Sequence, residues 1–225
     1  MSKCIGTVSR GIRTPIICEG DDLSAIVVSS VLEAAEEGGF TLRDRDIIAV
    51  TEAVVARAQG NYADVDNVAL DIAQKYGDKT IGVIFPILSR NRFAVCLRGI
   101  ARGAKRIVLM LSYPSDEVGN HLISLDQVEE ANIDPWNDVL SLEQYRRLFG
   151  VSLHPFAGVD YVDYYMNLIR GEGAEAEVIF ANNPTAILSH TPHVLCCDIH
   201  TRERSKRKLR IAGAKTIYGL DDIMT

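Results

Sequence analysis

The sequence is poor in the features that mark disulfide-stabilised or zinc-bound domains. Its 225 residues include five cysteines, an odd number, and no C-x-x-C pair occurs among them. This pattern argues against a disulfide framework and against a zinc site. Cys196 and Cys197 are adjacent and lie within an apolar run, so we expect both thiols to be buried.

Long hydrophobic segments and a secretory leader are also lacking. No run approaches the roughly 20 apolar residues of a membrane span, and the N-terminus has no apolar stretch followed by a cleavage site. We therefore expect a soluble, cytoplasmic protein with no membrane partner. The 30 acidic residues outnumber the 24 basic ones, for a net charge of −6, so nucleic acid is not an expected partner either.

Several common catalytic and nucleotide-binding motifs are missing. The chain contains no G-x-x-x-x-G-K-[ST], no G-x-G-x-x-G, no G-x-S-x-G and no H-E-x-x-H. The five histidines do not have the spacing of metal ligands. Any bound nucleotide must therefore be held by a less common loop.

What the chain does contain is an alternation of short apolar runs and amphipathic stretches. Hydrophobic residues make up 47% of it, enough for a substantial core. The patterns predict helices over 22–37, 51–60, 66–76, 93–102 and 202–212, and strands over 46–51, 80–87, 106–111, 178–181 and 194–197. Such alternation is typical of a mixed α/β fold, in which helices flank a layered mixed sheet.

The middle of the chain breaks this alternation. Residues 124–155 have few apolar runs and include Trp136, the single tryptophan, which we expect to anchor the segment by packing. We therefore predict three parts. Residues 1–123 form an N-terminal α/β half, 124–155 a helical or irregular insertion, and 156–225 a C-terminal α/β half that carries a metal or phosphate site.

Two aspartates stand at positions suited to a ligand site. Asp160 follows the short Gly158-Val159 segment, and Asp198 ends an apolar run just before a basic stretch. In open α/β proteins ligands bind at the carboxyl ends of strands, and carboxylate oxygens suit Mg²⁺ and Mn²⁺. These two residues are the expected metal ligands.

Two groups of polar residues are candidates for binding phosphate or substrate. Arg90, Asn91 and Arg92 lie at a predicted helix start, where arginine forks and the helix dipole both favour an anion. The second group, His200, Thr201 and Arg202, follows Asp198 directly. In the predicted helix 202–212 we expect Leu209 and Ile211 to pack inward and Lys206 and Arg207 to lie in water. The alternative for both groups is an ordinary solvated helix start.

Four segments, in order, resemble the coenzyme F420-0:γ-glutamyl ligase family. They are GIRTPIICEGDDL (residues 11–23), LRDRDIIAVTEAVVARAQG (42–60), AGVDYVDYY (157–165) and VLCCDIHTR (194–202). Together they are scattered over most of the chain. The resemblance implies a divergent branch of the family and a γ-glutamyl ligase fold.

The resemblance also implies an activity. It predicts an amide ligase that uses GTP and Mg²⁺ or Mn²⁺ to join L-glutamate to a carboxylate acceptor, and that works as a homodimer. Asp160 and Asp198 match the positions of the metal ligands. The expected nucleotide contacts are Arg13, Thr14, Glu52, Arg57 and Asp163.

Some residues depart from the family pattern. Ile199 stands where the family has threonine, Arg57 where it has lysine, and the glycine-rich C-terminal region has no counterpart before Thr225. Two further hypotheses follow. One is a nucleotide- or metal-binding protein of the same fold without turnover, and the other is an α/β domain of a longer enzyme that continues beyond Thr225.

Overall fold

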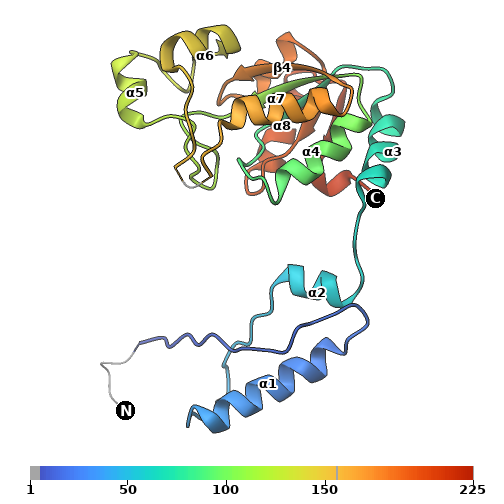
Figure 1. The fold of residues 1–225 in the computed structure, drawn as a ribbon, viewed down its shortest axis with the longest axis vertical. Coiled ribbons are helices and arrows are strands. Elements are labelled where there is room, and N and C mark those ends of the chain that lie inside the picture. The colour runs from blue at the N-terminus through green and yellow to red at the C-terminus, as the bar shows by residue number, and fades with distance from the viewer. Residues whose placement is uncertain (1–5, 156, 225) are drawn as a thin grey trace. The chain divides into compact units, whose positions relative to one another are not determined.

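The computed structural model of the protein describes residues 6–155 and 157–224, so Cys4 lies outside the described part. The chain divides into an N-terminal unit, Met1–Tyr62, and a C-terminal unit, Ala63–Thr225. The boundaries predicted from the sequence lie instead at 123/124 and 155/156. All three of those predicted parts supply strands or helices to the C-terminal unit, which is the larger of the two (Figure 1).

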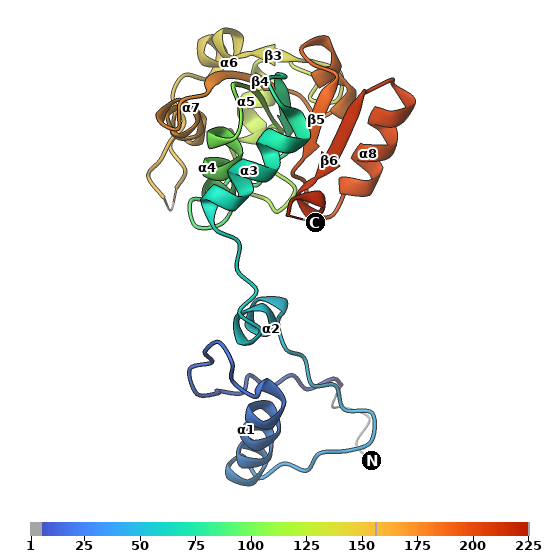
Figure 2. The same ribbon diagram turned by 90° about the vertical axis from the view of Figure 1, so that its right-hand side faces the viewer.

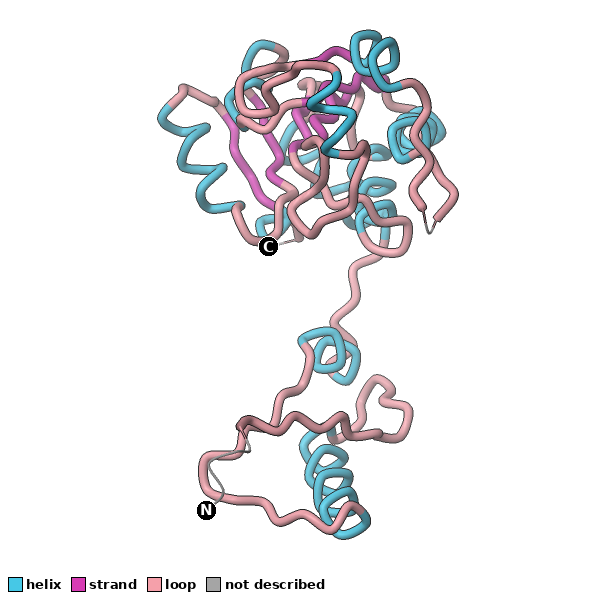
Figure 3. Tube along the Cα trace, turned by 90° about the vertical axis from the view of Figure 1, so that its left-hand side faces the viewer, coloured by secondary structure: helices cyan, strands magenta, loops and turns pink. Residues whose placement is uncertain are grey.

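The N-terminal unit contains two helices joined by irregular chain. They are α1 (Leu23–Glu37), whose first turn is capped by Asp22 through the Ala25 N–H at 3.0 Å, and α2 (Glu52–Ala58). The strand predicted at 46–51 is wrong, because Ile47 is 91% exposed and no described strand pairs with this segment. In Figure 3 all the strands belong to the C-terminal unit.

A six-stranded sheet organises the C-terminal unit. Its strands are β1 (Ile81–Ile84), β2 (Arg106–Leu111), β3 (Leu140–Ser141), β4 (Glu175–Phe180), β5 (His193–Cys196) and β6 (Thr216–Gly219). Their order across the sheet is β3-β4-β2-β1-β5-β6, and every neighbouring pair is parallel except β3 with β4. This mixed sheet confirms the α/β class predicted from the sequence.

Helices cover both faces of the sheet, as Figure 2 shows. One face packs against α3 (Val65–Tyr76), α4 (Phe93–Arg102) and α7 (Tyr161–Gly171), and the other against α8 (Arg202–Ile211) and the short 3₁₀ helix η1 (Pro184–Ser189). The remaining elements are α5 (Leu125–Glu130), α6 (Leu142–Phe149) and a second 3₁₀ turn, η2 (Leu220–Asp222). None of the described helices has the length and apolar character that a membrane crossing needs.

Strand β1 lies at the centre and is buried on both faces. Ile81 and Val83 belong to the core beneath the α3–α4–α7 layer, whereas Ile84 belongs to the core beneath α8. Gly82 faces η1 so closely that any Cβ would overlap Ile187. A strand covered on both sides is expected to be a continuous apolar run, which explains why this segment was recognisable in the sequence.

Helix and strand positions in this unit agree well with the sequence patterns. The predicted 93–102 helix and 106–111 strand have the same bounds as α4 and β2. Helix α7 was missed, because the segment around Asp160 was interpreted only as a ligand loop. Its N-cap is Asp160 itself, which accepts a hydrogen bond from the Asp163 N–H at 3.0 Å.

The predicted insertion, 124–155, is mainly helical but not separate from the sheet. It holds α5 and α6, each begun by a capping box, and contributes β3 to the sheet edge. Val128, Leu140, Tyr145 and Phe149 join it to the core, and Tyr145 stacks on Phe180 with ring centroids 3.9 Å apart. The expectation for Trp136 is wrong, since this side chain is 74% exposed.

Because Leu97 is buried and Trp136 is exposed, truncating the two side chains should affect the free energy of unfolding to very different degrees. Leu97→Ala removes a fully buried side chain of α4 and should lower the free energy of unfolding by about 2–5 kcal/mol. Trp136→Ala should change it by no more than about 0.5 kcal/mol. Urea unfolding followed by far-UV circular dichroism measures both, and equal losses would contradict the packing described here.

Candidate functional site

The direction in which successive strands are added to the sheet reverses between β1 and β5. From β1 the chain moves through β2 to β4 in one direction, with α4 and α7 on one face. From β5 it moves to β6 in the opposite direction, with α8 on the other face. In doubly wound sheets ligands bind at such a reversal, outside the carboxyl ends of the strands. The residues that follow β1 and β5 are therefore the first place to look for a site.

Asp198 follows β5 at this point and is 1% exposed. Its Oδ2 accepts hydrogen bonds from the hydroxyls of Thr201 and Ser205, both at 2.8 Å, but its Oδ1 is buried and has no partner among the described residues. Burial raises the pKa of Asp198, the two hydroxyls counteract this in part, and the charge of Glu117 raises the pKa further. A buried oxygen without a partner costs stability, so this carboxylate is suited to a ligand that supplies a positive charge or a donor.

Glu117 faces the same loop from the segment after β2. Its carboxylate accepts hydrogen bonds from the backbone N–H groups of Ile199 and His200, the second at 3.1 Å. Consecutive N–H groups of this kind form a small concave site for an anion. Glu117 was not among the site residues predicted from the sequence, because a single acidic residue after a strand forms no recognisable motif.

The cationic side chains beside Asp198 are already paired. The Nε of Arg202 donates to the backbone oxygen of Asp198 at 2.9 Å, and its guanidinium lies 3.0 Å from Asp221. Lys206 is 4% exposed and lies 2.8 Å from Asp222 and 3.3 Å from Asp221. Both cations therefore join α8 to the segment after β6.

This arrangement corrects two expectations about α8. Lys206 was expected in water, but its pairing with the two aspartates keeps it buried. Ile211 was expected to pack inward, but it is 81% exposed, and Leu209 alone of the predicted inward pair is buried.

Asp160, an expected metal ligand, is held by Arg146 and by backbone N–H groups. Its two oxygens accept a bidentate pair from Arg146, at 2.7 and 2.8 Å, and also the N–H groups of Ser152 and Asp163. Burial alone would raise the pKa of Asp160, but the hydrogen bonds from Arg146 and the backbone lower it overall. These four hydrogen bonds occupy the carboxylate, and a cation would have to displace some of them, so metal binding by Asp160 stays a prediction.

Asp163, an expected nucleotide contact, also binds Arg146, at 2.7 Å, with its side chain half exposed. The four other expected nucleotide contacts, Arg13, Thr14, Glu52 and Arg57, are exposed and belong to the N-terminal unit. Their roles remain predictions. No group of three or more His, Cys, Asp or Glu side chains placed to share a metal ion occurs in residues 6–155 and 157–224.

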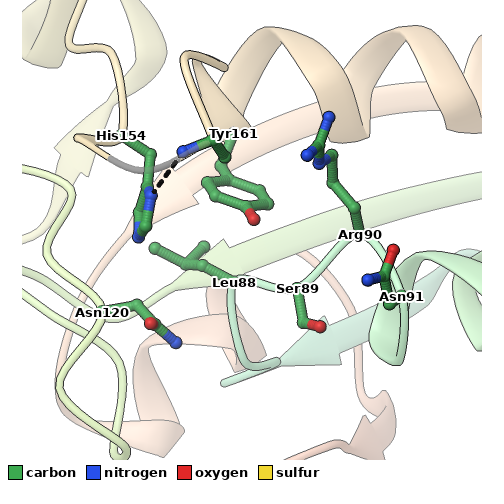
Figure 4. A pocket seen from close by; sticks show the side chains of 8 residues that line it. Leu88, Ser89, Arg90, Asn91, Asn120, His154 and Tyr161 are labelled. Atoms are coloured by element: carbon green, nitrogen blue, oxygen red, sulfur yellow. Dashed lines mark hydrogen bonds between the residues drawn. The ribbon is translucent and has the colours of Figure 1, made fainter.

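A second concave region involves the other predicted binding group. Arg90 and Asn91 line a pocket with Asn120, His154 and Tyr161, shown in Figure 4. Arg92 does not line it, although its backbone N–H donates to the hydroxyl of Ser89 at 3.2 Å. The structure thus brings two of the three predicted residues together with side chains that the sequence did not connect to them.

A family model described as F420-0:gamma-glutamyl ligase matches residues 11–193. The chain belongs to this family. A coenzyme F420:L-glutamate ligase from Methanothermobacter thermautotrophicus is 37% identical over 68 residues, which are 28% of this chain and 25% of that relative. The match thus spans about a quarter of the relative's length.

Solved structures resemble the chain only weakly. Crystal structures of eIF2B beta from Chaetomium thermophilum and of the tetrameric eIF2B-beta2-delta2 complex from C. thermophilum align with TM-scores of 0.35 and 0.33, at 10% and 11% identity. They cover 69% and 64% of this chain, and 40% and 35% of the other chains. Likeness of this degree supports no statement about function.

The bonding of Asp160 predicts a stability effect. Asp160→Asn removes the charge that Arg146 needs and should lower the free energy of unfolding by about 1.5–3 kcal/mol. Asp163→Asn is the matched control, because it removes a half-exposed partner of the same arginine and should cost less than about 1 kcal/mol. Calorimetry with Mn²⁺ on Asp160→Asn tests metal binding by this residue, since a loss of affinity would support it and an unchanged affinity would refute it.

Proposed function

We propose that this protein is a ligase that joins L-glutamate to a carboxylate acceptor through an amide bond, using GTP and a divalent cation. Membership of the F420-0:γ-glutamyl ligase family supports the reaction class. The observation that carries the location of the site is the buried, unpartnered Oδ1 of Asp198 at the reversal of strand order. We also retain a homodimeric, cytoplasmic enzyme as part of the proposal.

The residues near Asp198 fit a magnesium or manganese ion. Mg²⁺ commonly uses only one or two protein carboxylates and completes its shell with water and substrate phosphates. Asp198 supplies a free oxygen, and Glu117 brings a second carboxylate to the same loop. When bound there, the cation would supply charge neutralisation to phosphate groups.

The protein's own contribution is positioning. Thr201 and Ser205 hold one oxygen of Asp198, which fixes the direction of the other. The first turn of α8 adds its dipole and N–H groups at the same place, and these favour a phosphate. Amide ligation through an acyl phosphate needs such placement and neutralised charge more than it needs a protein nucleophile.

One observation favours the second hypothesis, a binding protein of the same fold. In this structure Glu117 occupies the N–H groups of Ile199 and His200, and Arg202 is paired with Asp221. A phosphate would have to displace that glutamate before it could use the loop. Turnover in an assay with GTP, L-glutamate, Mn²⁺ and an F420-0-type acceptor separates the two hypotheses.

Asp198→Asn tests the cation site. This substitution should lower Mn²⁺ affinity at least about tenfold, because it removes the charge of the proposed ligand. Without Mn²⁺ it should not lower the free energy of unfolding, since the amide oxygen still accepts from Thr201 and Ser205 and a buried charge is gone. If Asp198 had a purely structural role, the variant would bind Mn²⁺ with unchanged affinity and would have a lower free energy of unfolding.

Asp66→Asn is the control for charge alone. Asp66 is an exposed carboxylate in the first turn of α3, and its loss changes the net charge equally. Calorimetric titration with Mn²⁺ compares the affinity of the unaltered protein with those of Asp198→Asn and Asp66→Asn. Unchanged affinity in Asp198→Asn would overturn the proposed site.

A further inference from the structure

The pocket beside α4 is built from three loops at one end of the sheet. Leu88, Ser89, Arg90 and Asn91 come from the loop after β1, and Asn120 from the loop after β2. The segment before α7 contributes His154 and Ala157, and α7 itself contributes Tyr161 (Figure 4). The cavity volume is about 230 Å³.

Buried groups behind the pocket hold two of these loops together. Asp116, 6% exposed, accepts from the Leu88 N–H at 2.8 Å, and from the backbone and side-chain N–H groups of Asn120 at 2.8 and 2.7 Å. The hydroxyl of Tyr165 accepts from the Ser89 N–H at 2.8 Å and donates to the oxygen of Ile87 at 2.7 Å. The pocket wall is therefore in place before any ligand arrives, which lowers the entropic cost of binding.

The charge in the pocket favours a negative ligand. Among the described lining residues Arg90 is the one with a permanent charge, none is acidic, and no carboxylate of the described chain pairs with Arg90. The carboxylate of Asp116 lies behind the wall and is directed at N–H groups. Helix α4 begins at Phe93, three residues after Arg90, so its positive end adds to the same field.

The size and lining restrict the ligand further. Pockets for drug-sized molecules measure roughly 300–1,000 Å³, so this smaller cavity is too small for a whole nucleotide. The amides of Asn91 and Asn120 and the hydroxyl of Ser89 offer both donors and acceptors, as an amino acid requires. The Nδ1 of His154 accepts from the Ala157 N–H at 3.3 Å, so a neutral ring carries its proton on Nε2.

We propose that this pocket binds L-glutamate, with one carboxylate of the amino acid on the guanidinium of Arg90. Arginine binds carboxylates through two parallel N–H groups, and its loss therefore costs both charge and orientation. Asn91 and Asn120 contribute polar contacts to the rest of the ligand. The inference rests on the proposed ligase function, which requires a site for the amino acid apart from the proposed cation site at Asp198.

Arg90→Met tests the proposal by removing the charge and keeping most of the side-chain length. Calorimetry with L-glutamate, in the presence and absence of GTP and Mn²⁺, should show affinity reduced about tenfold or more. Arg98→Met is the control, because Arg98 is an arginine of α4 that does not line the pocket and pairs with Glu172 at 3.1 Å. Its glutamate affinity should equal that of the unaltered protein.

Two further measurements make the outcomes separable. Inorganic phosphate serves as a competitor, since a pocket that prefers phosphate to L-glutamate would contradict the assignment. In the ligase assay Arg90→Met should raise KM for L-glutamate and leave KM for GTP unchanged.

Turnover of Arg90→Met with an unchanged KM for L-glutamate would overturn this inference and leave the proposed function standing. Glutamate binding that depends on Arg90 without any turnover would refute the ligase and support the pocket. An absence of glutamate binding under both conditions would overturn the pocket assignment.

Discussion

The central placement of β1 between β2 and β5 is the constraint on which the functional region depends. Parallel pairing on both sides puts the carboxyl ends of all three strands at one edge of the sheet. The loops that leave this edge carry Arg90, Asn120 and Asp198, residues that are far apart in the sequence. Because only glycine fits where Gly82 meets Ile187, a one-residue shift in the register of β1 would force a larger side chain into that contact. The positions of the three loops follow from that register.

Four acidic residues near the edge of the sheet show how environment decides the role of one kind of side chain. Asp116 is buried and bonded to N–H groups, Asp160 is held by an arginine, and Glu117 accepts from a loop. Asp198 alone among the four has a buried oxygen without a partner in the described chain. Asp116, Asp160 and Glu117 stabilise the loops through these bonds. The unpaired oxygen of Asp198 lowers stability, and local losses of stability of this kind are typical of functional sites.

Most of the fold of the C-terminal unit was readable from the sequence, because its central elements have strong patterns. The apolar runs of β1, β2 and β5 and the amphipathic α4 were found at nearly their true positions. The failures have local causes. An apolar segment at 46–51 resembles a strand but pairs with no strand of the described chain, and α7 begins at an aspartate that was interpreted as a ligand.

By itself the sequence determined the α/β class, the family and the polar residues at strand ends, since these depend on periodicity and local motifs. Only the tertiary structure decided which of those residues meet. It assigned Asp160 to Arg146, brought Glu117 to the loop after Asp198, and joined Arg90 with Asn120 in one pocket. The physical reason is that strand order and helix packing set distances between segments, and neither is encoded in the spacing of residues along the chain.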